Sequence, residues 1–351
     1  MRISVLTAVL TALLVSPLLA VNVEGFESTY AEALDKARKQ DKPLYLHFTT
    51  DWCSWCRKIE QDTYTDAKAK KALEHFVPAS LDCTVPRGQE PSKQAKINSD
   101  LMQKYGGSGY PFLAMVTPDG VVLGTISGYV KPDQFVEELA NARKVHKRWK
   151  QFQKDAKTAK KDDYDFQAKA MKIYAEVNKM DKAAEAAKRV GELDPENKKG
   201  DAVEASFVLL QDAWKSLSTA EDQKAKAKAG NRIDSQIEKI RKLDPKNEKK
   251  ILQKALQGEA TRHIGQVRQA ADRAEAVTHL QAASNLLQEL TGSAKTLENK
   301  QQVYAMLGQT HLFLQERDKA LQALKTALEA DEDSPIAEKL KQVIQQLEAA
   351  G

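Results

Sequence analysis

Two kinds of hydrophobic pattern divide the chain. From residue 22 to about 145, short apolar runs bounded by glycine, proline and polar residues alternate with helical segments. That pattern predicts strands among helices. From about 155 onward the chain is rich in Ala, Lys, Gln, Glu and Leu, and apolar residues recur at helical spacing. The second half is therefore expected to be helical throughout, and 351 residues are enough for two such domains.

In the first half the pattern predicts an opening helix, then strands and helices in alternation, then a hairpin and a last helix. The expected helices are 30–39, 57 towards 64, 66–74, 99–105 and 133–144. The expected strands are 42–48, 76–83, 112–116 and 121–127, the last two joined by a turn at Asp119-Gly120. This order predicts an α/β sandwich.

The first twenty residues have the pattern of a secretory signal peptide. A positive start at Met1-Arg2 is followed by a largely apolar run, residues 5–19, and by the small residue Ala20. A membrane anchor is the alternative, but the run is short and polar residues and a proline interrupt it. We expect cleavage after Ala20, export to the periplasm or extracellular space, and no stable membrane span in the cleaved protein.

Charge is interleaved along the helical segments rather than gathered in a tail. The chain has 54 Lys and Arg against 49 Asp and Glu, a formal excess of +5. Interleaved charge is typical of solvated helix faces, so we expect no nucleic-acid partner. The basic segment 143–150 is interpreted as the exposed end of a connecting helix, with an affinity for anionic surfaces as the alternative.

The run Trp52-Cys53-Ser54-Trp55-Cys56 carries the most specific chemistry. A strand precedes it and a helix follows it, which places Cys53 at a helix N-terminus. There the helix dipole and unpaired amides favour thiolate over thiol. Because the thiolate is the species that attacks disulfides, this pattern indicates thiol–disulfide exchange.

A structural or metal role for these cysteines finds less support in the sequence. The chain has three cysteines, an odd number, so at least one thiol is free or pairs transiently. Zinc favours four ligands at close spacing, whereas the six histidines are scattered and only His47 is near. We therefore expect no metal. The third cysteine, Cys83, is interpreted as a small buried residue, with a regulatory or second resolving thiol as the alternative.

These motifs together resemble a thioredoxin-fold domain over residues 22–145. The resemblance rests on Asp51-Trp52-Cys53-Ser54-Trp55-Cys56, on the Gly109-Tyr110-Pro111 turn, on the Pro118-Asp119-Gly120 hairpin and on Gly128 before the last helix. The sequence is similar to the periplasmic thiol-reductase branch of that superfamily.

The resemblance implies a role for individual residues. Cys53 would be the nucleophile and Cys56 the resolving thiol, with the two cycling through a redox-active disulfide. Pro111 would be a cis proline facing the dithiol, which holds Tyr110 so that its backbone pairs with a substrate strand. Trp52 would shield the thiols and shape the substrate groove.

Two features depart from the family pattern. His47 stands on the strand beneath the dithiol, where thioredoxins usually carry a buried acid. It is either a proton acceptor for the resolving thiol or a core histidine hydrogen-bonded to backbone. The inner pair Ser54-Trp55, which tunes the redox potential, offers no positive charge to stabilise a thiolate. We therefore expect a reductant rather than an extreme oxidant.

The second half carries recurring helix stops at 193–197, 243–247 and 333–335. The segment 304–327 resembles a tetratricopeptide repeat, in which Gly308 with Ala320 would allow the closest helix approach. Spacing between the stops is irregular, so residues 166–349 are interpreted as a degenerate α-helical repeat domain, joined to the first by a connecting helix over 146–165. Such arrays usually bind a protein or peptide; a supporting or dimerising bundle is the alternative.

Two hypotheses about function follow. The first is an exported thiol–disulfide oxidoreductase that acts on protein disulfide or dithiol substrates, while the helical repeats bind a protein partner. It would need an upstream protein electron donor, because no flavin or nicotinamide signature appears and no cofactor is expected. The alternative is a non-catalytic redox-sensing interaction protein in which the helical repeats are the working part.

Overall fold

The computed structural model describes residues 25–293 and 299–349. The expected signal peptide, residues 1–20, lies outside these residues. The chain divides into two compact units. The first unit contains the chain up to Lys157 together with Glu176–Asn178, and the second contains Thr158–Ala175 and Lys179–Gly351.

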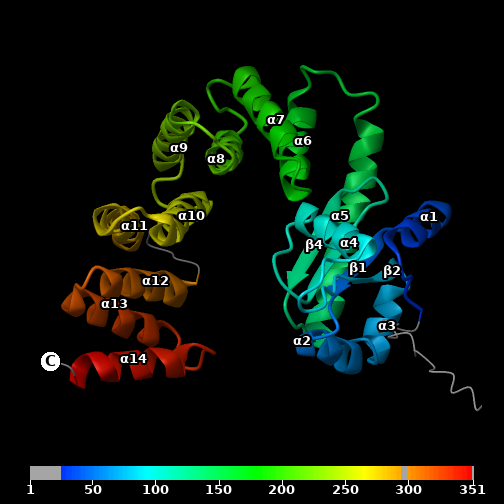
Figure 1. Ribbon diagram of the computed structural model, residues 1–351. Helices are drawn as coiled ribbons and strands as arrows, with labels where there is room; N and C mark the ends of the chain where they lie inside the picture. The colour runs from blue at the N-terminus through cyan, green and yellow to red at the C-terminus, as the bar shows by residue number, and fades with distance from the viewer. Residues whose placement is uncertain (1–24, 294–298, 350–351) are drawn as a thin grey trace, which may run out of the picture. The chain divides into compact units, whose positions relative to one another are not determined.

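The first unit is built on a four-stranded mixed sheet in the order β2-β1-β3-β4 (Figure 1). Strand β1 (Leu44–Thr49) pairs in parallel with β2 (Val77–Asp82) and antiparallel with β3 (Phe112–Val116). Strand β4 (Val122–Ser127) closes the sheet as an antiparallel neighbour of β3. All six residues of β1 are buried, as expected of a central strand covered on both faces. The predicted α/β architecture is confirmed.

Helices cover both faces of this sheet. Helices α1 (Tyr30–Gln40) and α4 (Lys93–Lys104) bury their apolar residues against one face, with Leu44, Leu46 and Phe48 of β1. The other face is covered by α2 (Ser54–Lys58), α3 (Ala67–Leu73) and α5 (Pro132–Asp155). On that side the ring of Tyr45 meets Phe135 of α5 edge-on, with centroids 5.5 Å apart.

Three helices differ from their predicted extents. Helix α4 begins at Lys93, six residues earlier than predicted, because the Ser92 side chain accepts the Ala95 N–H and caps it. Helix α5 continues to Asp155 instead of ending at 144, because its buried stripe extends through Val145, Trp149 and Phe152. The helix after the dithiol is interrupted, since α2 ends at Lys58 and a π-helical turn follows over Ile59–Thr63.

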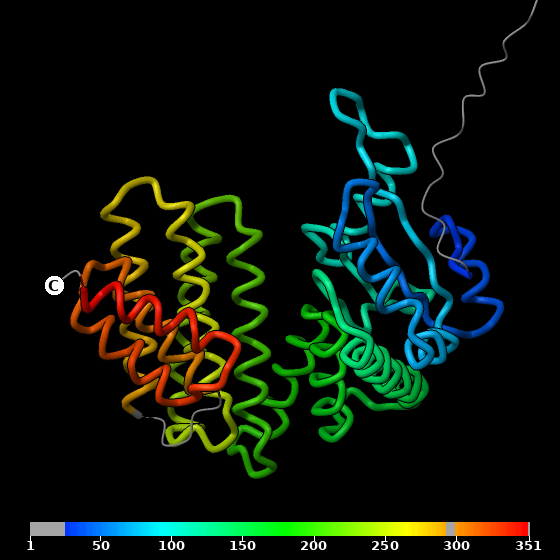
Figure 2. Tube along the Cα trace, turned by 90° about the horizontal axis from the view of Figure 1, so that it is seen from below, coloured from blue at the N-terminus to red at the C-terminus, as the bar shows by residue number. Residues whose placement is uncertain are grey.

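The second unit contains only helices and their connectors in its described residues, and from α7 to α14 neighbouring helices pack in succession (Figure 2). The largely helical C-terminal region is thus confirmed. Its helices are α6 (Tyr164–Glu176), α7 (Met180–Leu193), α8 (Ala202–Ser218), α9 (Gln223–Leu243), α10 (Ile251–Gln266), a 3₁₀ turn (Val267–Gln269), α11 (Arg273–Ser293), α12 (Lys300–Phe313), α13 (Arg317–Ala330) and α14 (Ala337–Ala349). None of the described helices, in either unit, combines the length and apolarity that a membrane crossing requires.

A glycine allows α12 and α13 to pack closely. A Cβ added at Gly308 would lie 2.7 Å from the side chain of Leu324, nearer than real Cβ atoms approach a neighbour. The nearest side chain to Gly308 is that of Leu324, one helical turn beyond Ala320. Ala320 is itself fully buried on α13.

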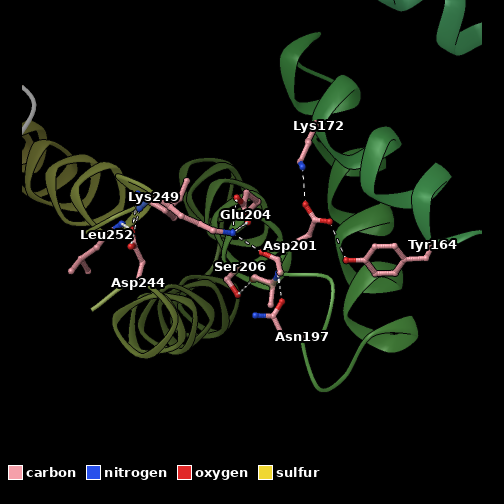
Figure 3. Close-up of polar contacts among 12 residues, drawn as sticks. Tyr164, Lys172, Asn197, Asp201, Glu204, Ser206, Asp244, Lys249 and Leu252 are labelled. Carbon is pink, nitrogen blue, oxygen red and sulfur yellow. Dashed lines mark hydrogen bonds and ion pairs between the residues drawn. The ribbon is translucent and has the colours of Figure 1, made fainter. Parts of the chain in front are cut away.

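Two of the helix stops have similar connectors, in which an aspartate accepts backbone N–H groups of the turn. Figure 3 shows Asp244 of the second connector and Asn197 of the first. The Asp244 carboxylate accepts N–H groups from Lys249, Ile251 and Leu252 at 3.0–3.2 Å. The Asp194 carboxylate accepts the N–H groups of Lys198 and Lys199, both at 2.8 Å. These bonds give partners to amide groups of both connectors and to the first two amides of α10, which the helix itself leaves unpaired.

An asparagine three residues later completes each connector. Asn197 and Asn247 both adopt the left-handed backbone conformation, with φ of 53° and 55°. Their side-chain oxygens accept the N–H of Ala202 at 3.0 Å and of Gln253 at 2.9 Å. Asparagine tolerates this conformation better than most residues, so its place in both stops has a structural reason.

Candidate active site

The two cysteines of the Cys-X-X-Cys motif lie where β1 turns into α2. Cys53 is the residue that caps α2, and its N–H donates to the Thr50 carbonyl at 3.1 Å. Its sulfur is bonded to that of Cys56 in a disulfide whose Cα atoms are 5.3 Å apart. The Cys56 N–H donates to the Cys53 Sγ at 3.1 Å. This amide is placed to stabilise a thiolate at Cys53 once the disulfide is reduced.

Two hydrogen bonds fix the loop that carries Cys53. The Asp51 N–H donates to the Thr84 hydroxyl at 2.8 Å, which ties the loop to the residues after β2. The Arg57 guanidinium donates to the Asp51 carbonyl at 2.6 Å, which ties the loop to α2. The nucleophile is therefore held by the sheet and by its own helix.

Two exposed tryptophans flank a nearly buried disulfide. Trp52 and Trp55 are 63% and 56% exposed, whereas Cys53 and Cys56 are 4% and 1% exposed. Trp52 meets the ring of Tyr110 edge-on at 5.7 Å. Large aromatic surfaces that remain open to solvent are typical of sites that contact another molecule.

The Tyr110–Pro111 peptide bond is cis. The backbone on either side is closely constrained, because a Cβ added at Gly107 would lie 2.6 Å from the ring of Phe112. The Gly128 N–H donates to the Pro111 carbonyl at 2.9 Å and so holds this turn against the end of β4. Trp52 packs on Tyr110, so the cis-proline turn adjoins the dithiol loop.

His47 is fully buried and makes no hydrogen bond to any residue that the structure describes. The expected bond to backbone is therefore absent, and its ring instead meets Tyr64 edge-on at 5.6 Å. Burial lowers the pKa of His47 to about 3, because the charged imidazolium would lose its hydration. Burial therefore favours the neutral form of the His47 imidazole.

Cys83 is a buried thiol at the end of β2, and it is 2% exposed. Burial is the largest influence and raises its pKa, although hydrogen bonds from Ser99 and Tyr110 act in the opposite direction. Its S–H donates to the Leu81 carbonyl at 3.7 Å. A protonated, buried thiol is a poor nucleophile, so these contacts favour a packing role.

Tyr129 belongs to the site but was not among the site residues predicted from the sequence. Tyr129 packs against Trp55 with ring centroids 5.8 Å apart. Its hydroxyl donates to Asp62 at 3.1 Å, and the Lys58 ammonium lies 5.4 Å from its ring centroid. The sequence feature that could have identified Tyr129 is its position directly after Gly128, in the turn at the dithiol end of the sheet.

Comparison with known proteins agrees with this geometry. The sequence profile of the thioredoxin-like domain family matches residues 30–143, so this part of the chain is a thioredoxin-like domain. The disulfide bond reductase DsbH of Chlamydia pneumoniae is 32% identical over 109 residues, which cover 30% of this chain and 62% of that protein.

A second relative is the thiol:disulfide interchange protein DsbD of Neisseria meningitidis serogroup A, 32% identical over 109 residues. That match covers 30% of this chain and 16% of DsbD. The solved C-terminal domain of N. meningitidis DsbD in its oxidised form is 28% identical, with a TM-score of 0.26, over 32% of this chain and 94% of that one. The chain therefore spans less than two thirds of the length of the curated relatives it matches.

Proposed function

We propose that this chain is an exported thiol–disulfide oxidoreductase that reduces protein disulfides. The observation that carries the proposal is the Cys53–Cys56 disulfide at the start of α2, with the Cys56 amide bonded to the Cys53 sulfur. The adjoining cis Tyr110–Pro111 turn and the names of the relatives, a reductase and an interchange protein, support the same chemistry.

The proposed cycle begins with the reduced dithiol. The Cys53 thiolate attacks one sulfur of a substrate disulfide, so a mixed disulfide forms and the first substrate thiolate leaves. The Cys56 thiol then loses its proton and attacks the Cys53 sulfur, which releases the second substrate thiolate. The product is the Cys53–Cys56 disulfide present in this structure. A protein dithiol donor returns two electrons and two protons to reduce it again.

In this cycle we assign His47 to packing rather than to proton transfer. An imidazole whose pKa is about 3 binds a proton poorly at neutral pH, so it is a weak base for the Cys56 thiol. We expect His47→Leu to keep the turnover and the pH profile of disulfide reduction. A slower release of the mixed disulfide together with a shifted pH profile would restore the proton-acceptor hypothesis.

Insulin reduction with dithiothreitol tests the proposal directly. The wild type is expected to accelerate the reaction, Cys53→Ser to abolish the acceleration, and Cys56→Ser to accumulate mixed disulfides. Cys83→Ser is the matched control, because it removes a buried thiol outside the disulfide and should leave the rate unchanged. Equal inactivity of the wild type and Cys53→Ser would contradict catalysis. In that case, binding of a partner that follows the oxidation state would favour the redox-sensing alternative.

Export and partner binding belong to the same proposal. The signal-like pattern of residues 1–20 supports export, and a mature protein that begins at Val21 in a periplasmic or secreted fraction would verify it. The helical second unit supports the binding of a protein partner, since arrays of packed helices offer extended surfaces for one. In the Cys56→Ser variant of the full chain, bound proteins should remain trapped as mixed disulfides on Cys53. Identification of the trapped proteins tests both the partner and the substrate class.

A further inference from the structure

One helix of the first unit carries a row of basic side chains that disulfide exchange does not use. Arg143, Lys147, Lys150 and Lys154 follow one another along α5 at spacings of four, three and four residues. Residues at this spacing share one face of a helix. The row is about 16 Å long, since each residue advances the helix by about 1.5 Å.

This basic row lines a pocket of about 450 Å³. The opposite wall comes from the segment before β1, including Asp41 and Lys42. Five Lys and Arg side chains line the pocket against one acidic side chain, an excess of four, while the whole sequence has an excess of +5. The hollow is therefore strongly basic.

Little inside the protein compensates this charge. Lys150 pairs with Asp41 at 2.5 Å, but Arg143, Lys147 and Lys154 form no ion pair within residues 25–293 and 299–349. Arg143 and Lys147, four residues apart, repel each other and weaken the helix. Elsewhere many basic side chains meet acidic partners, as Arg241 meets both oxygens of one glutamate. Three unpaired cations on one wall are an arrangement that an external anion would stabilise.

The pocket lies at the end of the sheet opposite to the dithiol. Lys42 precedes β1 and Cys53 follows it, and the six residues of β1 separate these ends by about 20 Å. Lys42 also donates from its ammonium to the Glu74 carbonyl at 2.9 Å, which ties the segment before β1 to the end of α3. A ligand there would leave the disulfide accessible to its substrate.

We propose that the basic pocket on α5 binds an anion that carries phosphate groups. Phosphate spreads its charge over several oxygens, which suits the planar guanidinium of Arg143 together with the point charges of Lys147 and Lys154. The length of the row matches a ligand with more than one phosphate, or neighbouring lipid headgroups of the same chemistry. Inorganic tripolyphosphate and vesicles of phosphatidylglycerol distinguish these two sources.

The test compares the full-length protein with two triple variants of equal charge change. The pocket variant carries Arg143→Gln, Lys147→Gln and Lys154→Gln, which leaves the Lys150–Asp41 pair intact. The control carries Lys224→Gln, Lys226→Gln and Lys228→Gln, three exposed lysines on α9 in the second unit.

Binding to tripolyphosphate is measured by titration calorimetry, and binding to vesicles by cosedimentation, with phosphatidylcholine vesicles as the neutral reference. We expect the wild type to bind at least one probe, more weakly as salt rises. The pocket variant should lose at least about tenfold in affinity, and the control should not. Insulin reduction should be unchanged in both variants. Failure of the wild type to bind either probe, or an equal loss in both variants, overturns the proposal.

Discussion

Burial of His47 should make the stability of the first unit depend on pH in a specific way. The pKa of His47 is about 3 in the folded protein and about 6.5 in an unfolded chain. The unfolded chain therefore binds a proton below about pH 6.5 that the folded protein does not bind. The stability contribution is complete above about pH 6.5 and is lost progressively as the pH falls from there towards about 3.

The magnitude follows from the size of this window. Each pH unit below about 6.5 lowers the free energy of unfolding by about 1.4 kcal/mol. At about pH 5 the loss due to His47 is about 2 kcal/mol, and this value requires only that the folded pKa lie well below 5. His47→Leu removes the effect. Near pH 7 the same substitution should leave the free energy of unfolding unchanged or raise it, because an unpaired buried polar group costs about 1–3 kcal/mol.

Urea unfolding followed by tryptophan fluorescence measures this difference. In a Trp214→Phe background the remaining tryptophans, Trp52, Trp55 and Trp149, all lie in the first unit, so the signal reports that unit alone. The free energy of unfolding is determined near pH 7.5 and near pH 5 for proteins with and without His47→Leu. The protein with His47 should lose about 2 kcal/mol more between the two conditions than the variant.

A second histidine makes the subtraction necessary. Burial also lowers the pKa of His146 on α5, so part of the acid sensitivity of the first unit remains in the His47→Leu variant. Only the difference between the two proteins isolates His47. The same loss of stability on acidification in both proteins would refute the reasoning, since it would mean that His47 titrates normally in the folded state.

Two further predictions concern the second unit and are measured by urea unfolding followed by far-ultraviolet circular dichroism. Gly308→Ala should destabilise it by about 1–3 kcal/mol, because the new Cβ meets Leu324 at 2.7 Å. The matched control Gly191→Ala on α7, where nothing lies within 4 Å, should instead stabilise it by about 0.5–1 kcal/mol, and similar effects at both sites would contradict the packing argument. Asp244→Ala should cost about 1–3 kcal/mol, because three backbone N–H groups lose the buried carboxylate that accepts from them; an unchanged midpoint would show that water replaces it.

The strands and the dithiol were predictable because their signals are local. The strand predicted over 112–116 has the observed bounds, and the other three agree to within two residues at each end. Apolar runs between glycine and proline, and a Cys-X-X-Cys between a strand and a helix, need no knowledge of distant residues. Helix bounds were less accurate where charge obscured the apolar period. The end of α5 was placed at 144 although Trp149 and Phe152 continue its buried stripe.

The surroundings of His47 and the role of Tyr129 could not be read from the sequence. Whether the two nitrogens of His47 find partners depends on how residues far along the chain pack around β1, and they find none among the residues that the structure describes. Tyr129 becomes part of the site only because the turn before α5 reaches Trp55. Both properties are produced by tertiary packing, which a local pattern does not encode.

The aspartate–asparagine connectors have a consequence for how the second unit can change over time. In each connector an aspartate and an asparagine accept backbone N–H groups that lie fewer than ten residues away. When a segment that ends in such a connector is duplicated, the copy therefore contains the residues that end its last helix. When such a segment is deleted, those residues are removed with it. The helical array should accept the gain or loss of a whole helix pair between connectors more readily than a change of a few residues within a helix, and its length can evolve independently of the redox domain.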